Sequence, residues 1–331
     1  MRTYKQLTQE QRYYISTEIK NGISQTKIAQ AIDVSKSTVS REIKRNSGLR
    51  GYRYKQAQKK AVERRQYASK SIEMTGDMIA LIDEKLSEDQ WSPEQISGWL
   101  LFEKMIALSH ERIYQHIWDN KKQGGDLHQY LRRQGKKYQK RGSNGKSSRG
   151  QIINRISIDD RPKIIDDKRR VGDWEIDTVI GKGHSGALVT IVERKTLYTL
   201  VARVNGKRAD WVTQATTQLL EPFKDRLHSI TADNGKEFAY HAQISKELNT
   251  AFYFAHPYSS WERGLNENTN GLIRQYFPKE TDFKKITDEE VYSVMEKLNN
   301  RPRKSLGFRT PFQAMKSSFA RTGISCVALQ S

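Results

Sequence analysis

Apolar residues in the first 134 positions of the chain recur three and four residues apart, which is the spacing of amphipathic helices. Three short helices are predicted within residues 8–46, and the first begins at a capping box formed by Thr8 and Gln11. Three more are predicted between residues 78 and 118, two of which begin at Ser92 and Ser109. The front of the chain is therefore expected to be helical.

Both helical groups contain two helices joined by a short turn, the arrangement of a helix-turn-helix that reads DNA. In each group the second of these helices offers polar and basic side chains that can reach base edges or phosphates. In the first group these candidate DNA-binding residues are Lys36, Ser37, Thr38, Ser40, Arg41, Lys44 and Arg45. In the second group they are His110, Arg112 and Gln115. The alternatives are a three-helix bundle with a solvated basic face and, for the second group, a structural or dimerising helical domain.

The pattern changes after residue 155, where short β-rich runs alternate with helical segments. Strict alternation over Asp173–Ile180 predicts a strand with Asp173, Glu175 and Asp177 on one face. Further strands are predicted at residues 187–193, 198–204, 229–232 and 251–255, and helices at 210–223, 239–249, 260–277 and 287–299. This order predicts a mixed sheet flanked by helices, as in an α/β ribonuclease-H-like fold.

Residues 135–150 separate the two halves, with six basic residues, no acid and no apolar periodicity. Such a segment is typical of a flexible cationic linker. We therefore expect four parts: a helix-turn-helix domain at 1–50, a second helical domain at 51–134, a linker at 135–155, and an α/β domain with a C-terminal helical tail at 156–331. Residues 50–70 are basic and could form a helix that either follows DNA phosphates or is simply solvated.

The formal net charge of +20 indicates a polyanionic partner, and most of it lies in the front of the chain. Residues 1–155 carry 31 Lys and Arg against 16 Asp and Glu, whereas residues 156–331 carry 27 against 22. The lone Cys326 excludes an internal disulfide and any cysteine-rich zinc module. No apolar run is long enough for a membrane helix and no signal core follows Met1, so we expect a soluble protein of a reducing, cytoplasmic compartment.

Acidic residues in the back half stand where strands and helices would bring them together. Asp177 lies on the predicted strand, Asp233 ends another strand before an Asn-Gly turn, and Glu267 lies on a later helix. Thirty-three residues separate Asp233 from Glu267. An Asp-Asn-Gly sequence alone is usually a turn, and Asp173 and Glu175 compete with Asp177 because they share its strand face. Three converging carboxylates are nevertheless the ligands that hard divalent cations prefer.

Four motifs in this half follow one another in a fixed order. They are Trp174-Glu-Ile-Asp177, Thr231-Ala-Asp233-Asn-Gly-Lys-Glu-Phe, the segment from His256-Pro-Tyr through Asn266-Glu267 to Tyr276-Phe-Pro, and Asn300-Arg-Pro-Arg-Lys-Ser-Leu-Gly-Phe-Arg-Thr-Pro311. With the N-terminal helices, they resemble the DDE transposases of the insertion sequence thirty family, within the retroviral-integrase superfamily. The resemblance covers most of the chain. One departure is Glu262, where a glutamine is expected.

The resemblance implies that Asp177, Asp233 and Glu267 are catalytic and hold two Mg²⁺ or Mn²⁺ ions. Two such ions, about 3.5–4 Å apart, activate an oxygen nucleophile, stabilise phosphoryl charge and assist the leaving oxygen. Water would first release a 3′-OH at the end of the element, and this 3′-OH would then attack target DNA. Arg263, Glu267 and Arg274 lie on one face of the predicted helix, so both arginines are expected to contact DNA. The alternative is a surface ion pair between Arg263 and Glu267 beside a solvated Arg274.

The implied partners are double-stranded DNA, as terminal inverted repeats and as target, and at least one further copy of the chain, because transposition joins two ends. The implied location is the prokaryotic cytoplasm, at the nucleoid. Two other functions are considered: a transcriptional regulator with an inactive ribonuclease-H-like domain, and a hydrolytic nuclease or resolvase of the same fold. The complete triad argues against the first, and the two helix-turn-helix groups argue against the second.

Overall fold

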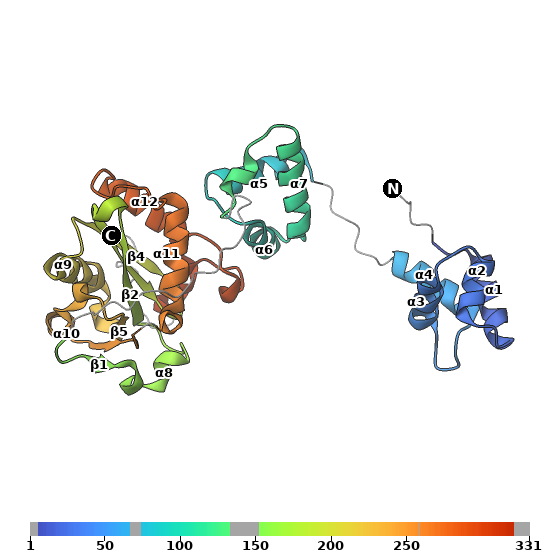
Figure 1. Ribbon diagram of the computed structural model, residues 1–331, viewed down its shortest axis with the longest axis horizontal. Helices are drawn as coiled ribbons and strands as arrows, with labels where there is room; N and C mark the ends of the chain where they lie inside the picture. The colour runs from blue at the N-terminus through green and yellow to red at the C-terminus, as the bar shows by residue number, and fades with distance from the viewer. Residues whose placement is uncertain (1–5, 67–73, 133–151, 258, 321–331) are drawn as a thin grey trace. The chain divides into compact units, whose positions relative to one another are not determined.

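The computed structural model describes residues 6–66, 74–132, 152–257 and 259–320, which belong to two compact units (Figure 1). The first unit spans Met1–Ile72 and the second spans Glu73–Ser331. Residues 135–151 of the linker predicted at 135–155 lie outside the described residues, as does Cys326.

The described residues of the first unit form the helices α1 (Gln9–Lys20), α2 (Gln25–Ala31), α3 (Lys36–Asn46) and α4 (Tyr54–Gln66). The predicted capping box at the start of α1 is present, and the side chains of Ser24 and Ser35 cap α2 and α3. Ile15, Ile28 and Val39 are fully buried between the helices. Helices α2 and α3, with the turn between them, form the first predicted helix-turn-helix.

This unit is longer than the domain predicted to end at residue 50, because α4 packs back against the preceding helices. The rings of Tyr13 on α1 and Tyr54 on α4 meet edge to face, with centroids 5.0 Å apart. Lys60 donates to the carbonyl of Ser47 at 2.8 Å. Most of the basic segment at 50–70 is therefore a helix of the first compact unit, and the second helical group begins after it.

The second unit begins with the helices α5 (Gly76–Ser87), α6 (Pro93–Lys104), α7 (His110–Lys122) and the short η1 (Leu127–Tyr130). The predicted capping box at Ser92 and the predicted cap at Ser109 are both present. Ile82, Leu100 and Ile113 are fully buried in a core that belongs to this helical group. Helices α6 and α7 occupy the positions of the second predicted helix-turn-helix.

The remainder of the second unit is built on a mixed sheet whose strand order is β1-β6-β5-β2-β3-β4. Its strands are β1 (Ile156–Ser157), β2 (Asp173–Ile180), β3 (Ala187–Glu193), β4 (Thr199–Val204), β5 (Ser229–Ala232) and β6 (Ala251–Phe254). Strands β1, β6, β5 and β2 run parallel to one another, whereas β2, β3 and β4 are antiparallel neighbours. Helical units followed by an α/β domain with a mixed sheet confirm the fold class predicted from the sequence.

Helices pack against both faces of this sheet (Figure 1). They are α9 (Ala209–Leu220), α10 (His241–Leu248), α11 (Gly264–Tyr276), α12 (Asp288–Asn299) and α13 (Pro311–Ala320), and the short helix α8 (Lys163–Asp166) precedes β2. Short 3₁₀ helices are η2 (Ile158–Asp160), η3 (Lys182–His184), η4 (Glu221–Arg226), η5 (Lys236–Phe238), η6 (Ser260–Arg263) and η7 (Lys304–Leu306). One core joins Ile176 of β2 to Val212 of α9, and the other joins Val179 of β2 to Leu272 of α11. Strand β2 is therefore covered on both faces.

The helical group α5–α7 contacts the sheet domain of the same unit. Arg301, only 2% exposed, donates a hydrogen bond to the carbonyl of Gln90. The hydroxyl of Tyr276 donates to the carbonyl of Asp89 at 3.0 Å. Because Tyr276 ends α11, the helical group is attached to the helix that carries Glu267.

The sequence pattern predicts a C-terminal helical tail without giving bounds for α13, and it does not predict strand β1 or the short helix α8. In α13 the side chains of Thr310 and Gln313 each accept from the other's backbone N–H, at 3.1 and 2.9 Å. The same Ser/Thr-Pro-x-Gln start is present at Ser92, so this signal was available. Strand β1 has two residues, too few for an alternation to be visible. Ile152, within the predicted linker, is 9% exposed and belongs to the core, so the sheet domain starts earlier than residue 156.

Gly172 sets the relative position of β2 and β5. Its φ of +109° lies in the region that favours glycine, and its carbonyl accepts from the backbone N–H of His228 at 2.8 Å. Its own N–H donates to Glu193 at 3.1 Å. A Cβ at this position would lie 1.7 Å from the carbonyl oxygen of Arg226. No larger residue fits without moving one of the two strands.

Gly172→Ala is predicted to lower the free energy of unfolding by about 3 kcal/mol or more, because backbone strain and a steric clash combine. The measurement is chemical denaturation followed by circular dichroism. Gly183→Ala is the matched control, because φ is +55° there and nothing lies within 4 Å of the added Cβ. That control should cost only about 1 kcal/mol. Equal losses for both variants would show that the clash at Gly172 is relieved at no cost.

Candidate active site

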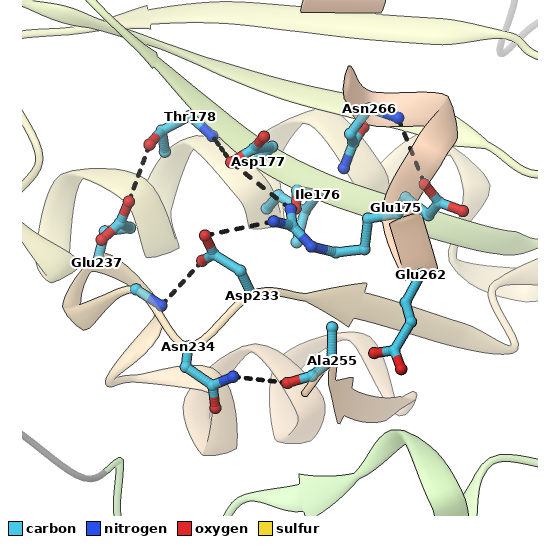
Figure 2. A network of polar contacts seen from close by, with 12 residues as sticks. Glu175, Ile176, Asp177, Thr178, Asp233, Asn234, Glu237, Ala255, Glu262 and Asn266 are labelled. Atoms are coloured by element: carbon cyan, nitrogen blue, oxygen red, sulfur yellow. Dashed lines mark hydrogen bonds and ion pairs between the residues drawn. The ribbon is translucent and has the colours of Figure 1, made fainter. Parts of the chain in front are cut away.

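Asp177 and Asp233 come from neighbouring parallel strands in matching register. Glu175 of β2 pairs with Thr231 of β5, and the two aspartates each lie two residues further along their own segments. Side chains two residues apart point to the same side of a strand, and adjacent strands are about 4.8 Å apart. The two carboxylates therefore face the same space, and Figure 2 shows both within one network of polar contacts.

Arg263 lies between these two carboxylates. Its terminal nitrogens are 3.6 Å from Asp177 Oδ1 and 3.3 Å from Asp233 Oδ2, and one of them donates to the carbonyl of Ile176 at 3.3 Å. Arg263 is 8% exposed. The sequence predicts that it contacts DNA, but in this conformation its guanidinium faces the aspartates. No ion pair joins it to Glu267 among the described residues, so the alternative surface pair is not formed here.

The protonation of Asp177 reflects opposing influences. Burial raises the pKa of the Asp177 carboxyl, and the nearby Asp233 carboxylate adds to this rise. The Arg263 guanidinium and the backbone N–H of Thr178, which donates to Asp177 Oδ1 at 2.8 Å, act in the opposite direction. The net direction is upward, because the effect of burial outweighs the contributions of Arg263 and Thr178.

Asn270 is a site residue that the sequence analysis missed. Its side-chain amide donates to Asp177 Oδ2 at 2.9 Å and accepts from the hydroxyl of Thr190 at 3.0 Å. Thr190 is the register partner of Asp177 on β3. The available signal was spacing, since Asn270 follows Arg263 by seven residues and Glu267 by three, which places all three on one face of a helix.

Glu267 lies in the first turn of α11 and its side chain is exposed. Arg263 and Asn270, which precede and follow it by about one turn, both contact Asp177. This helix face is thus directed at β2. Among the residues that the structure describes, however, no three acidic, histidine or cysteine side chains gather closely enough to hold a metal ion. The first two acids of the predicted triad are adjacent, and the third is on the adjoining helix face without completing a metal site.

A further acid, Glu237, also lies beside the two aspartates and was not predicted. It is 7% exposed and accepts from the hydroxyl of Thr178 at 2.9 Å (Figure 2). Burial acts to raise the pKa of Glu237, but its ion pair with Lys207, at 2.5 Å, reverses this and the net shift is downward. A Cβ on Gly235 would lie 2.5 Å from Glu237 Oε2 and 2.8 Å from Asp233 Oδ1. Glycine at this turn therefore leaves room for both carboxylates.

The structure separates the three acids that alternate along β2. Asp173 accepts from Arg170 at 2.8 Å and from Ser229 at 2.6 Å. Glu175 forms a buried ion pair with Arg194. Both are engaged away from Asp233, and only Asp177 shares a cation with it. Of the three acids on this strand face, Asp177 is the one that lies beside Asp233, and its role as a ligand stays a prediction.

The unexpected Glu262 has a structural partner. It accepts from the backbone N–H of His256 at 2.8 Å and lies 2.8 Å from its ring Nδ1. The other ring nitrogen is 2.9 Å from Asp159. The Glu262 and Asp159 carboxylates raise the pKa of His256. Figure 2 shows Glu262 apart from the Asp177–Asp233 pair, so this departure does not alter the site itself.

The candidate DNA-binding residues lie mainly on exposed surface. On α3 the exposed ones are Lys36, Ser37, Ser40, Arg41, Lys44 and Arg45. Thr38 is half-buried and lies 2.9 Å from the hydroxyl of Ser35. On α7 the exposed ones are His110, Arg112 and Gln115. Arg274 instead donates to the carbonyl of Pro278 at 3.2 Å and lies over the ring of Phe283, and burial lowers its pKa. Its predicted contact with DNA stays a prediction.

Comparison with known proteins places these features in a family. Residues 3–46 match the helix-turn-helix domain family. The catalytic core domain of BIV integrase superimposes loosely, with a TM-score of 0.37 and 17% identity, over 46% of this chain and 98% of that chain. No helix in the described parts is long and apolar enough to cross a membrane.

Similar sequences extend over nearly the whole chain. The transposase of insertion sequence element IS4351 of Bacteroides fragilis is 49% identical, covering 94% of this chain and 96% of its own. Transposase InsI of element IS30A of Escherichia coli is 37% identical over 97% of this chain and 86% of its own. The transposase of element IS1086 of Cupriavidus metallidurans is 32% identical over 96% of both chains. The chain therefore belongs to the IS30 family of insertion-sequence transposases.

Proposed function

We propose that the protein binds the terminal inverted repeats of an insertion sequence and uses divalent metal ions to cut DNA and join it to a target. The observation that carries the proposal is that Asp177 of β2 and Asp233, which directly follows β5, each lie two residues beyond the register pair Glu175–Thr231. Both lie beneath the face of α11 that carries Glu267. Similarity along the whole chain to transposases of three insertion sequences supports the same activity.

The residues at this position suit a hard divalent cation. Asp177 and Asp233 supply carboxylate oxygens, and each already lies within 4 Å of a buried cationic group, which supports positive charge between them. Asp177 would contact both ions, Asp233 one and Glu267 the other. Bound ions would activate the oxygen nucleophile and stabilise charge on the phosphoryl group and the leaving oxygen.

The remaining residues of the site would orient these ligands. Asn270 and the backbone N–H of Thr178 each donate a hydrogen bond to one oxygen of Asp177. The protein and not the solvent therefore fixes the orientation of this carboxylate. The backbone N–H of Gly235 donates to Asp233 at 2.8 Å. Both aspartates are thus pre-oriented. Hydrolysis followed by attack of the freed 3′-OH needs no covalent enzyme intermediate.

DNA delivery is assigned to the two helical groups. Exposed Arg41 and Lys44 on α3 and Arg112 on α7 are basic side chains on the second helix of their groups, where helix-turn-helix proteins contact the major groove. We assign repeat recognition to α3 and supporting contacts to α7. Since transposition joins two DNA ends, the active assembly would contain at least two copies of the chain.

Replacing a triad acid is expected to abolish strand transfer without abolishing DNA binding. Asp177→Asn, Asp233→Asn and Glu267→Ala should each reduce joining by more than about 100-fold, because changing a residue that only orients a metal ligand already costs about 10–100-fold. The measurement is strand transfer of labelled terminal-repeat DNA in Mg²⁺. Glu262→Gln is the control, since it removes a nearby carboxylate outside the triad and should retain activity. Normal joining by Glu267→Ala would show that the site assignment is wrong.

Arg41→Ala is expected to weaken binding to terminal-repeat DNA by about 1–3 kcal/mol, the usual contribution of one base-reading side chain. The loss should be much smaller for unrelated DNA, as measured by fluorescence anisotropy at fixed salt. Lys20→Ala is the matched control, because Lys20 is exposed on the same unit but lies at the end of α1. If Arg112→Ala lost repeat binding while Arg41→Ala kept it, recognition would belong to α7 instead.

A further inference from the structure

Arg263 has a position that the proposed chemistry does not explain. It lies at the start of α11, is 8% exposed, and directs its two terminal nitrogens at Asp233, 3.3 Å away, and Asp177, 3.6 Å away. The same guanidinium donates to the carbonyl of Ile176 on β2. A buried cation therefore connects two adjacent strands through the carboxylates that would bind metal.

The two aspartates need a positive charge between them. Like charges on neighbouring strands repel, and the repulsion grows where burial excludes water. The Arg263 guanidinium offsets this repulsion without a metal. A divalent ion would offset it as well, but it must bind the same oxygens directly. The guanidinium and the ion therefore compete for one position.

Resting on the proposed metal site, we infer that Arg263 is an internal cation that holds Asp177 and Asp233 in the metal-free protein and is displaced when metal binds. Arg263 is a positioning residue in this account, because it acts on the ligands and not on the DNA bond. Its Nε is buried and has no hydrogen-bond partner among the described residues. An unsatisfied buried donor costs free energy, so the two carboxylates are the main interactions that hold the guanidinium in place. The guanidinium is released when a metal ion binds these carboxylates.

The same displacement explains why Glu267 is exposed. Glu267 follows Arg263 by one helical turn, so the two side chains approach Asp177 from the same face of α11. While Arg263 occupies the space beside Asp177, the described residues gather no set of three acids that could hold a metal ion. Withdrawal of Arg263 would vacate that space for Glu267, whereas Asn270 would keep its 2.9 Å bond to Asp177 throughout. The displaced guanidinium would then be free for the DNA contact predicted from the sequence.

A competing internal cation weakens the apparent affinity of the metal, because binding must first displace it. Arg263→Gln should therefore bind Mn²⁺ about tenfold more tightly than the wild type, as measured by isothermal titration calorimetry of the full chain without DNA at pH 8. That ratio corresponds to about 1.4 kcal/mol. Arg263→Lys keeps the charge and should stay within about threefold of the wild type.

Two controls separate the possible outcomes. Arg274→Gln removes an arginine of the same helix that bonds backbone carbonyls and no carboxylate, so it should leave Mn²⁺ affinity unchanged. The double replacement Asp177→Asn with Asp233→Asn should abolish Mn²⁺ binding both in the otherwise wild-type chain and in the chain that carries Arg263→Gln. Unchanged or weaker binding by Arg263→Gln, with binding still dependent on the aspartates, would overturn the inference and leave the proposed function standing. Binding that survives loss of both aspartates would overturn the metal site and the inference together.

A measurement on the wild-type chain covers the case in which Arg263→Gln does not fold. The Nε–H NMR signal of Arg263, identified by its loss in Arg263→Lys, should shift when Mg²⁺ is added, because the guanidinium leaves the carboxylates. The Arg274 signal should not move. A signal of Arg263 that stays in place at saturating Mg²⁺ would contradict displacement.

Discussion

The parallel pairing of β2 with β5 is the constraint on which the candidate site depends. It aligns Glu175 with Thr231 and hence brings Asp177 next to Asp233, although 55 residues of chain lie between the two acids. Gly172 sets the start of this pairing because its backbone serves both strands and no side chain fits there. Burial of β2 on both faces then holds the aligned strands in place. A half-buried pair of acids results, and the adjacent Arg263 guanidinium offsets the repulsion between them.

Helix α11 connects this pair to the rest of the second unit. Its inner face contributes Leu272 to the core shared with β2, while Asn270 bonds Asp177 directly. Its C-terminal end is held by the helical group α5–α7, through the bond from Tyr276 to Asp89. The proposed third ligand, Glu267, is therefore on a helix that contacts both the sheet and a predicted DNA-binding group. A displacement of the sheet or of the helical group α5–α7 can therefore be transmitted to the site through α11.

Local signals made much of the fold predictable. Capping residues such as Ser92 and Thr287 and the alternation along β2 located their elements nearly to the residue, because these patterns act over short distances. The closeness of Asp177 and Asp233 was also predictable, since one lies on β2 and the other directly follows β5. That the two acids bind metal stays a prediction. The position of Arg263 between the two acids was not predictable. Spacing shows that Arg263 shares a helix face with Glu267, but it does not show which residues that face packs against. Glu237 and Asn270 were missed for the same reason, as their partners are distant in sequence.

We propose that Asp177, Asp233 and Glu267 together bind the metal ions of this transposase. The most direct measurement is anomalous diffraction from crystals of the protein with terminal-repeat DNA grown in Mn²⁺. We expect one peak in contact with both Asp177 and Asp233 and a second in contact with Asp177 and Glu267, with Arg263 withdrawn from the carboxylates. Peaks at other residues, or ions bound while Arg263 still bridges the two aspartates, would contradict this proposal.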